Sequence, residues 1–177
     1  MSFHAGTSHK PRGLVQVVSL ILVLLAAFLC RNSYGDDGMN ARELLGSFEW
    51  NSRPIVIFGS GEASDAQAGA QLKSLWSMSD NLASRDIVLV SVQKDKVLVH
   101  RPQDASSDSD SRTYEDAALA GELRAHFEVT KGQFTVLLIG KDGSVKRRSE
   151  TPVDSQSLFS QIDSMPMRQA EMIKARD

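Results

Sequence analysis

A short polar turn, Gly59-Ser60-Gly61-Glu62, is one stretch of this sequence whose residue types could do chemistry. It follows an apolar run and precedes a segment with helical spacing. Free backbone N–H groups at the start of a helix can bind an anion or another ligand. Ser60 and Glu62 are therefore candidate ligand-binding residues. The alternative is a turn whose side chains only cap the helix.

A serine nucleophile would need a neighbouring base. His100 and His126 are the histidines outside the N-terminal segment, and neither stands in a pattern typical of a catalytic base. We expect both at the surface. The single cysteine, Cys30, lies in the N-terminal segment, so cleavage before Asp36 would leave no thiol for a disulfide, a metal site or a nucleophile. No catalytic residue is predicted, and a binding role is favoured over an enzyme.

Charged residues outside the apolar stripes form a second set of candidates. Such an arginine needs an anionic partner, either within the protein or on a ligand or partner protein. Arg85 could form a structural ion pair with Asp86 or Asp163, and Lys141 could pair with Asp163 or Glu171. The alternative is a docking patch. The set comprises Arg53, Arg85, Asp86, Arg124, Lys141 and Arg168.

Two further patterns, a set of methionines and an Asp- and Ser-rich segment, could bind a partner or a metal ion. Met165, Met167 and Met172 could form an adaptable interaction surface, because thioethers repack easily, or could fill a core. Oxygen-bearing side chains from Asp104 to Glu115 follow part of a calcium-loop pattern, but serine stands where the loop requires glycine. No metal site and no cofactor are predicted.

The periodicity predicts the elements that position these side chains. Expected strands are Ile55–Phe58, Ile87–Val92, Val97–His100, and a hairpin of 134–139 and 144–146 around an Asp-Gly turn. Expected helices are 41–48, 65–82, 114–127 and 154–163. At Pro166 the last helix either kinks or is followed by a second short helix, and 102–112 is expected to be a loop.

This order predicts an α/β fold with a mixed central sheet and helices on both faces. The first two strands should be parallel, because a helix connects them. The closing β-hairpin adds an antiparallel pair, and a C-terminal helix follows it. This arrangement is the thioredoxin-like plan.

The N-terminal 35 residues are typical of a secretory signal peptide. Lys10 and Arg12 precede an apolar run from Leu14 to Leu29, and Ser33-Tyr34-Gly35 offers a cleavage site. An uncleaved membrane anchor and lipidation at Cys30 are the alternatives. Each exports the domain, so we expect a periplasmic or secreted protein, or one anchored by its N-terminus with the domain outside the cytoplasm.

The remaining boundaries are a linker over 36–43, a domain over 44–172 and a frayed tail over 173–177. The net charge is −2 and no basic cluster stands out, so nucleic acid is not an expected partner. A membrane is expected to be a partner only through the leader.

The amino-acid sequence around the hairpin resembles that of thioredoxins. Phe127 to Thr135, the strand after it and the Lys-Asp-Gly-Ser-Val turn are similar to the thioredoxin stretch that carries the cis-Pro-Thr strand. A thioredoxin has Cys-x-x-Cys where this chain has Gly59-Ser60-Gly61-Glu62, and Phe134 stands in place of the cis-proline. Thiol–disulfide exchange and peroxiredoxin chemistry are therefore excluded.

A second set of residues carries a fuller resemblance. These are Trp50, Arg53 to Phe58, Gln71, Leu75, Arg85 to Val88, Leu123-Arg124, Phe127, Phe134 to Gly143, Lys146, Ile162 to Arg168 and Glu171-Met172. From about Leu44 to Met172 the chain resembles the bacterial family called domain of unknown function 4174, a thioredoxin-like domain also seen in some animal extracellular-matrix proteins. The resemblance implies this fold and an exported setting. It implies no reaction.

The sequence therefore predicts an exported, cysteine-free thioredoxin-like domain that binds an unknown protein or small ligand. One alternative is a cysteine-independent enzyme that uses Ser60 and Glu62 after the first strand, where open α/β sheets bind ligands. A structural role without any ligand is the other.

Overall fold

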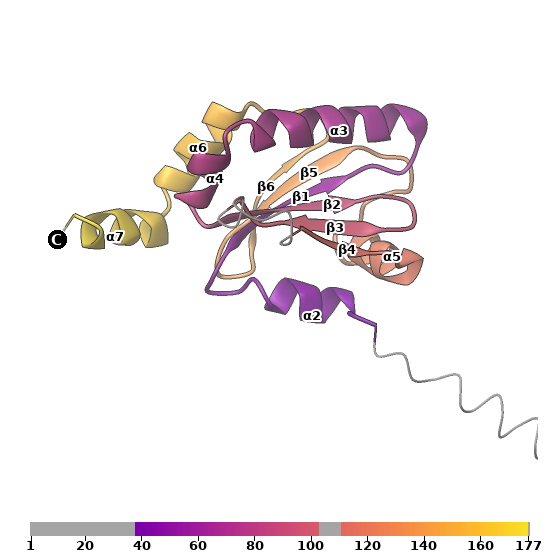
Figure 1. Cartoon of the computed structure of the whole chain (residues 1–177), viewed down its shortest axis with the longest axis horizontal. Coiled ribbons are helices and arrows are strands. Elements are labelled where there is room, and N and C mark those ends of the chain that lie inside the picture. The colour runs from indigo at the N-terminus through magenta and orange to yellow at the C-terminus, as the bar shows by residue number, and fades with distance from the viewer. Residues whose placement is uncertain (1–37, 103–110, 177) are drawn as a thin grey trace, which may run out of the picture. The chain divides into compact units, whose positions relative to one another are not determined.

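A six-stranded mixed sheet with the order β4-β3-β2-β1-β5-β6 is the centre of the fold (Figure 1). The computed structural model describes residues 38–102 and 111–176. The strands are β1 (Arg53–Phe58), β2 (Ile87–Val92), β3 (Val97–His100), β4 (Ser111–Tyr114), β5 (Thr135–Ile139) and β6 (Val145–Ser149). The helices are α2 (Ala41–Gly46), α3 (Glu62–Trp76), α4 (Ser79–Ala83), α5 (Ala117–His126), α6 (Ser155–Asp163) and α7 (Pro166–Lys174).

The strand pairing confirms the predicted thioredoxin-like plan. β1 and β2 are parallel and are joined through α3 and α4. β5 lies antiparallel to β1, and β6 returns beside β5 through the predicted hairpin. Gly143 has a φ of +73° in the hairpin turn, a conformation that glycine adopts without strain. The hairpin thus brings Lys141 and Asp142 to the end of the sheet where β1 and β2 begin.

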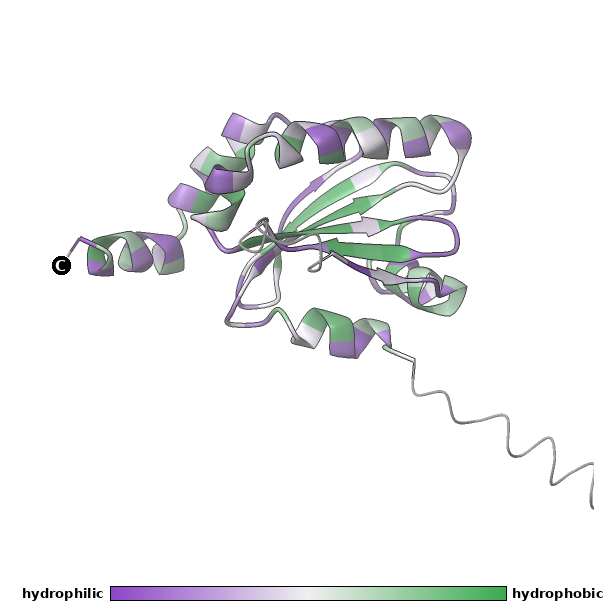
Figure 2. Ribbon diagram, viewed as in Figure 1, coloured by the Kyte–Doolittle hydropathy of each residue, from purple (hydrophilic) through white to green (hydrophobic). Residues whose placement is uncertain are grey.

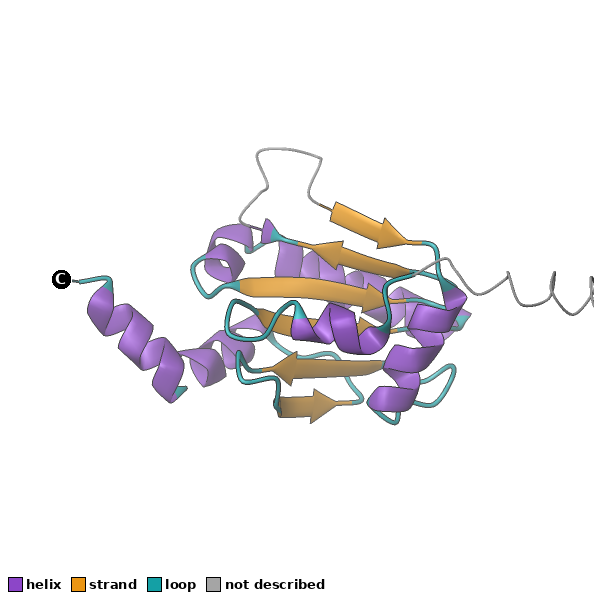
Figure 3. Cartoon of the chain, turned by 90° about the horizontal axis from the view of Figure 1, so that it is seen from below, coloured by secondary structure: helices purple, strands orange, loops and turns teal. Residues whose placement is uncertain are grey.

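The two faces of the sheet bury alternate residues of the central strands, as the two-residue period of a strand requires. On one face Val56 and Phe58 pack in a cluster with residues of α2 and α5. On the other face Ile55 and Ile57 pack with residues of α3, α4 and α6. Figure 2 shows the hydrophobic colour concentrated on these strands, and Figure 3 shows the sheet from the side of α2 and α5.

Two expectations about the middle of the chain were wrong. The predicted helix 65–82 is divided into α3 and α4, because the Ser77 hydroxyl donates to the Ser74 carbonyl at 2.7 Å and Met78 leaves the helical conformation. Ser111–Tyr114, predicted as loop and helix start, is the edge strand β4. α5 begins only at Ala117, because the Asp116 carboxylate accepts hydrogen bonds from the N–H groups of its first turn.

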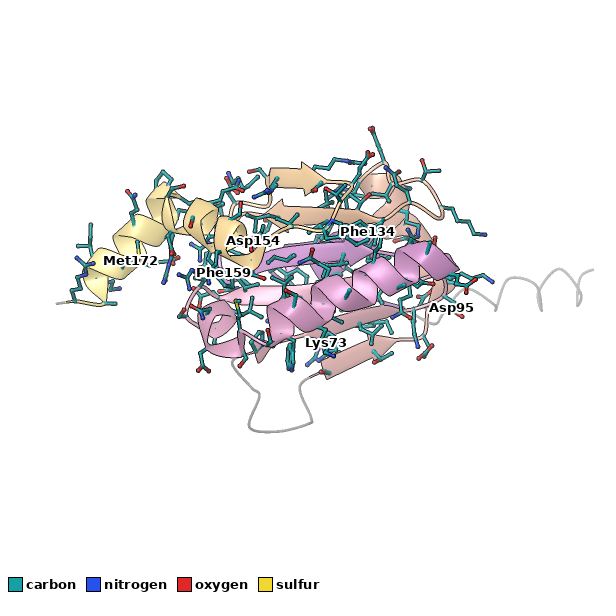
Figure 4. The ribbon with its side chains drawn as sticks, turned by 90° about the horizontal axis from the view of Figure 1, so that it is seen from above. Lys73, Asp95, Phe134, Asp154, Phe159 and Met172 are labelled. Atoms are coloured by element: carbon teal, nitrogen blue, oxygen red, sulfur yellow. The ribbon has the colours of Figure 1, made fainter. Side chains whose placement is uncertain are left out.

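Of the two alternatives at Pro166, a kink or a second short helix, the structure shows the second helix. Asp154 caps α6, and Pro166 occupies the first turn of α7, where its missing N–H has no cost. No residue of α7 is buried. Figure 4, viewed from the side of α3, shows Phe159 of α6 at the sheet and Met172 on α7, which projects past the end of the sheet.

Candidate ligand-binding site

Ser60 and Glu62 lie between β1 and α3, at the place expected from the sequence. The Ser60 hydroxyl accepts a hydrogen bond from the N–H of Gly132 at 2.7 Å, and the Ser60 N–H donates to the Ser64 hydroxyl at 3.1 Å. Among the described residues, no histidine or carboxylate is hydrogen-bonded to the Ser60 hydroxyl. These contacts hold the loop against the segment that precedes β5, and they do not activate a nucleophile.

Arg124 lies near the same end of the sheet but is buried, with 9% of its surface exposed. Its Nη2 donates to the carbonyls of Gly59 at 2.7 Å, Val92 at 3.0 Å and Gln93 at 3.3 Å. Burial lowers the pKa of Arg124, and the nearby Asp65 carboxylate acts in the opposite direction. Arg124 therefore ties together the ends of β1 and β2, which is a structural use of this cation.

The other predicted charged residues gather where β1 and β2 begin. Arg53 has 1% of its surface exposed, and its Nη2 donates to the Glu171 carboxylate at 2.9 Å. The Lys141 ammonium lies 2.8 Å from the same Glu171 oxygen and 2.7 Å from the Asp86 carboxylate. Arg53 Nη1 also donates to the Arg85 carbonyl at 2.9 Å. The hairpin turn, the start of β1, the residues before β2 and α7 thus meet in one network.

A third carboxylate, that of Asp163, extends this network. Arg85 holds Asp163 in a bidentate pair, with Nη2–Oδ2 at 2.6 Å and Nε–Oδ1 at 3.0 Å, and stacks over the Phe159 ring at 4.9 Å. Arg168 Nε lies 3.4 Å from the same carboxylate. Burial acts to raise the pKa of Asp163, but the two arginines hold it below its ordinary value. Of the pairs weighed for Arg85, the structure shows the one with Asp163.

A pocket of about 460 Å³ lies beside this network, between the hairpin turn and the junction of α6 and α7. Its lining includes the cationic side chains of Arg53, Lys141 and Lys146 and the apolar residues Met165, Pro166 and Met167. The remaining lining residues are Gly140, Asp142, Gln161 and Ser164. Each of the three cations pairs with a carboxylate of the domain, so an external anionic group would compete with Glu171, Asp86 or Asp142 for them.

The exposed Trp50 is a feature of this end that the sequence analysis did not single out as a site residue. Its side chain is 68% exposed, and its N–H donates to the Lys141 carbonyl at 2.7 Å. Its φ of +64° is unusual for a residue with a large side chain, and Asp86, in the network, has a φ of +52°. A sequence predicts a left-handed backbone conformation only where glycine, asparagine or aspartate stands, so a tryptophan at position 50 gives no sign of this conformation.

The pH dependence of α7 attachment follows from Glu171. Burial acts to raise its pKa, but the hydrogen bonds from Arg53 and Lys141 bring it down to about 2, from an ordinary value of 4.5. A carboxylate with a lowered pKa contributes stability that is complete above pH 4.5 and is lost as the pH falls toward 2. We expect α7 to detach in that range, so the methyl NMR signals of Met167 and Met172 should move toward random-coil positions. Wild type and Glu171→Gln should differ at pH 7 and converge at pH 2. Identical spectra at pH 7 would contradict this assignment.

The remaining candidates give no second constellation. His126 is exposed as expected, but His100 is half-buried, packs on the Trp76 ring at 5.6 Å, and has a pKa lowered by burial. Asp104 to Asp110 of the calcium-like pattern and the leader lie outside the described residues. The described part of the chain contains no group of three or more His, Cys, Asp or Glu side chains arranged to hold a metal ion. No helix in that part is long and apolar enough to span a membrane.

Comparisons with known proteins agree with the family resemblance. Over 143 residues the chain is 31% identical to coiled-coil domain-containing protein 80 of Danio rerio, and the match covers 77% of the chain and 16% of that relative. Solved structures similar to this chain include the mitochondrial 2-Cys peroxiredoxin of Plasmodium falciparum, with a TM-score of 0.46 and 12% identity. That match covers 68% of this chain and 79% of the peroxiredoxin chain. StoA of Bacillus subtilis matches with a TM-score of 0.33 and 12% identity over 63% of this chain and 82% of that one. The model of the family described as domain of unknown function (DUF4174) matches residues 44–171, and the chain therefore belongs to that family.

Proposed function

We propose that the domain is a non-catalytic module that binds a partner protein at the end of the sheet where β1 and β2 begin. The observation that carries this proposal is the pocket of about 460 Å³ whose lining combines three cationic side chains with two methionines and a proline. Methionine and arginine are enriched at protein interfaces, and methionine adapts its shape to a partner. Met167 is 40% exposed, and Trp50, 68% exposed, adds a large aromatic side chain at the same end.

The alternative, an enzyme that uses Ser60 and Glu62, has less support. The Ser60 hydroxyl accepts a hydrogen bond from a backbone N–H, and no base among the described residues is hydrogen-bonded to it. Arg124, the large cation near this end, is already shared among three backbone carbonyls. These contacts favour a structural role for that end of the sheet.

Recovery of a partner from the cells that make the protein tests this choice. We expect Lys146→Glu and Met167→Asp each to lower the recovery of a specific partner by about tenfold, which corresponds to about 1.4 kcal/mol of binding free energy. Lys131→Glu, an exposed charge reversal elsewhere, and Ser60→Ala with Glu62→Gln should recover as much partner as wild type. Circular dichroism checks that every variant is folded. Loss of recovery in the Ser60 and Glu62 variants, with none in the pocket variants, would reverse the assignment.

We also propose that the domain works outside the cytoplasm. The basic start and the apolar run from Leu14 to Leu29 support export, and these residues lie outside the described part of the chain. We expect N-terminal sequencing of the protein from its native host to begin at Asp36. A protein that retains residues 1–35 in a membrane fraction would instead indicate an anchor, and one that is found whole in the cytoplasm would contradict export.

A further inference from the structure

We infer that Arg53 and Lys141 form a carboxylate receptor that α7 fills from within the chain through Glu171, and that a glutamate-bearing peptide of the partner displaces α7 to take its place. This inference rests on the proposed function and names its ligand chemistry. It concerns the part of the network that faces the pocket, since Arg53 and Lys141 are both pocket-lining residues.

The receptor is built into the rigid part of the fold. Arg53 begins the central strand β1 and has 1% of its surface exposed, and its guanidinium is oriented by the Arg85 carbonyl at 2.9 Å. The Lys141 side chain is 10% exposed and is held 2.7 Å from the Asp86 carboxylate. A planar guanidinium and an ammonium fixed in this way are suited to one carboxylate.

The charge balance shows why the receptor needs an external anion when Glu171 leaves. Asp86 lies 3.7 Å from Arg53 and 2.7 Å from Lys141, so one carboxylate serves two cations. Without a second carboxylate, one buried positive charge would have no compensation, which is strongly unfavourable. Glu171 supplies that carboxylate, with one oxygen 2.9 Å from Arg53 and 2.8 Å from Lys141.

The helix that carries Glu171 is held by few contacts. None of its residues is buried, and its ion pairs to the rest of the domain come from Glu171 and from Arg168, which lies 3.4 Å from Asp163. A nine-residue helix without a buried face gains little from packing. Ser164 and Met165 separate α7 from α6, and Met165, in an extended conformation before Pro166, is where the inference places the pivot. Exchange of α7 for another glutamate-bearing segment therefore requires no disruption of the core.

The occupant is defined by what the receptor already holds. The carboxylate of Glu171 shows the group that is bound. Met165, which precedes α7 and packs against the core, stays in place when the helix leaves and offers an apolar surface to the residues next to that glutamate. Three of the pocket's charged lining residues are cationic and one, Asp142, is acidic, so an acidic segment is favoured over a basic one. A glutamate-bearing peptide with apolar neighbours, like α7 itself, meets these conditions.

The test uses the α7 sequence as a peptide in trans. A fluorescent peptide of residues 165–176 is titrated into the full wild-type chain, into Glu171→Gln and into Glu62→Gln, a matched control with the same charge change elsewhere. We expect Glu171→Gln to bind the peptide at least tenfold more tightly than wild type, because its own α7 no longer competes. Glu62→Gln should behave as wild type. A peptide with glutamine in place of its glutamate should lose this binding.

Several outcomes would overturn the inference. Equal affinity of wild type and Glu171→Gln, or equal binding of the two peptides, would show that the glutamate is not what the site recognises. Adding Lys141→Gln to Glu171→Gln should abolish binding while circular dichroism shows a folded domain, and retained binding would exclude the receptor. This titration needs no native partner, so the two proposals can fail separately. If the peptide does not bind but the pocket variants still lower partner recovery, only the inference about Glu171 is wrong. If the peptide binds as expected but Lys146→Glu and Met167→Asp leave partner recovery unchanged, only the proposed function is wrong.

Discussion

Arg124→Ala is expected to lower the free energy of unfolding by about 3 kcal/mol, because the carbonyls of Gly59 and Gln93 lose the guanidinium donor and the Val92 carbonyl keeps only the N–H of Gly59. The guanidinium donates to the carbonyls of Gly59, Val92 and Gln93, and its carbon lies 5.5 Å from the centre of the Phe58 ring. Both the hydrogen bonds and this packing are lost in alanine. Urea denaturation monitored by circular dichroism measures the change.

Two controls separate this effect from a general effect of removing an arginine. Arg124→Lys keeps the charge but cannot reproduce the planar fork, so we expect an intermediate loss of stability. Arg42→Ala, on the exposed side of α2, should change the free energy of unfolding by less than about 0.5 kcal/mol. A loss of less than about 1 kcal/mol for Arg124→Ala would show that water or a rearranged side chain replaces the guanidinium.

Arg53→Met is expected to cost about 3 kcal/mol, because it removes one partner from a buried group of charges. Arg53 has 1% of its surface exposed and contacts the carboxylates of Glu171 at 2.9 Å and Asp86 at 3.7 Å. In the variant, Lys141 alone would face both carboxylates. We therefore expect a lower midpoint in urea and, in the folded state, the random-coil methyl signal of Met172 that marks a detached α7.

The matched control is Lys146→Gln, which removes an exposed cation from the same pocket. Lys146 pairs with Asp142 at 2.7 Å, and both side chains are at least one third exposed. Such a pair contributes less than about 1 kcal/mol, so the variant should unfold almost as wild type and keep α7 attached. If Arg53→Met were as stable as wild type, the charge network would not contribute to the free energy of unfolding, which would contradict its structural role.

The sequence predicted the central strands and the hairpin because their signals are local. The run Ile87 to Val92 is apolar except for Ser91, which is typical of a strand buried on both faces, and it forms β2 with those bounds. The Asp-Gly turn specifies a hairpin by its own conformational preference. β4 was missed because Ser111–Tyr114 is an edge strand that depends on its pairing with β3 and on the packing of Tyr114 against the core. Its polar residues have no alternating pattern to detect.

The candidate site was predicted only in its residue types. Arg53 and Glu171 are 118 positions apart, and no local pattern tells which arginine meets which carboxylate. The sequence did not show that Arg124 binds backbone carbonyls while Arg53 binds carboxylates. It also did not show that the two arginines lie at opposite ends of the sheet. The pocket depends on how α6 and α7 pack beside the hairpin turn, and tertiary packing alone decides that. Trp50 was part of the family resemblance, but its exposure and left-handed backbone are visible only in three dimensions.

Site-specific photo-crosslinking in the native host tests the central claim most directly. A benzophenone amino acid is placed at Met167, in the pocket, and in a second protein at Glu62, at the opposite end of the sheet, and the adducts are identified by mass spectrometry. The account predicts one reproducible protein adduct from Met167 that is lost when Lys146→Glu is added, and none from Glu62. A protein or small-molecule adduct from Glu62, with none from Met167, would contradict it and return the functional site to the loop after β1.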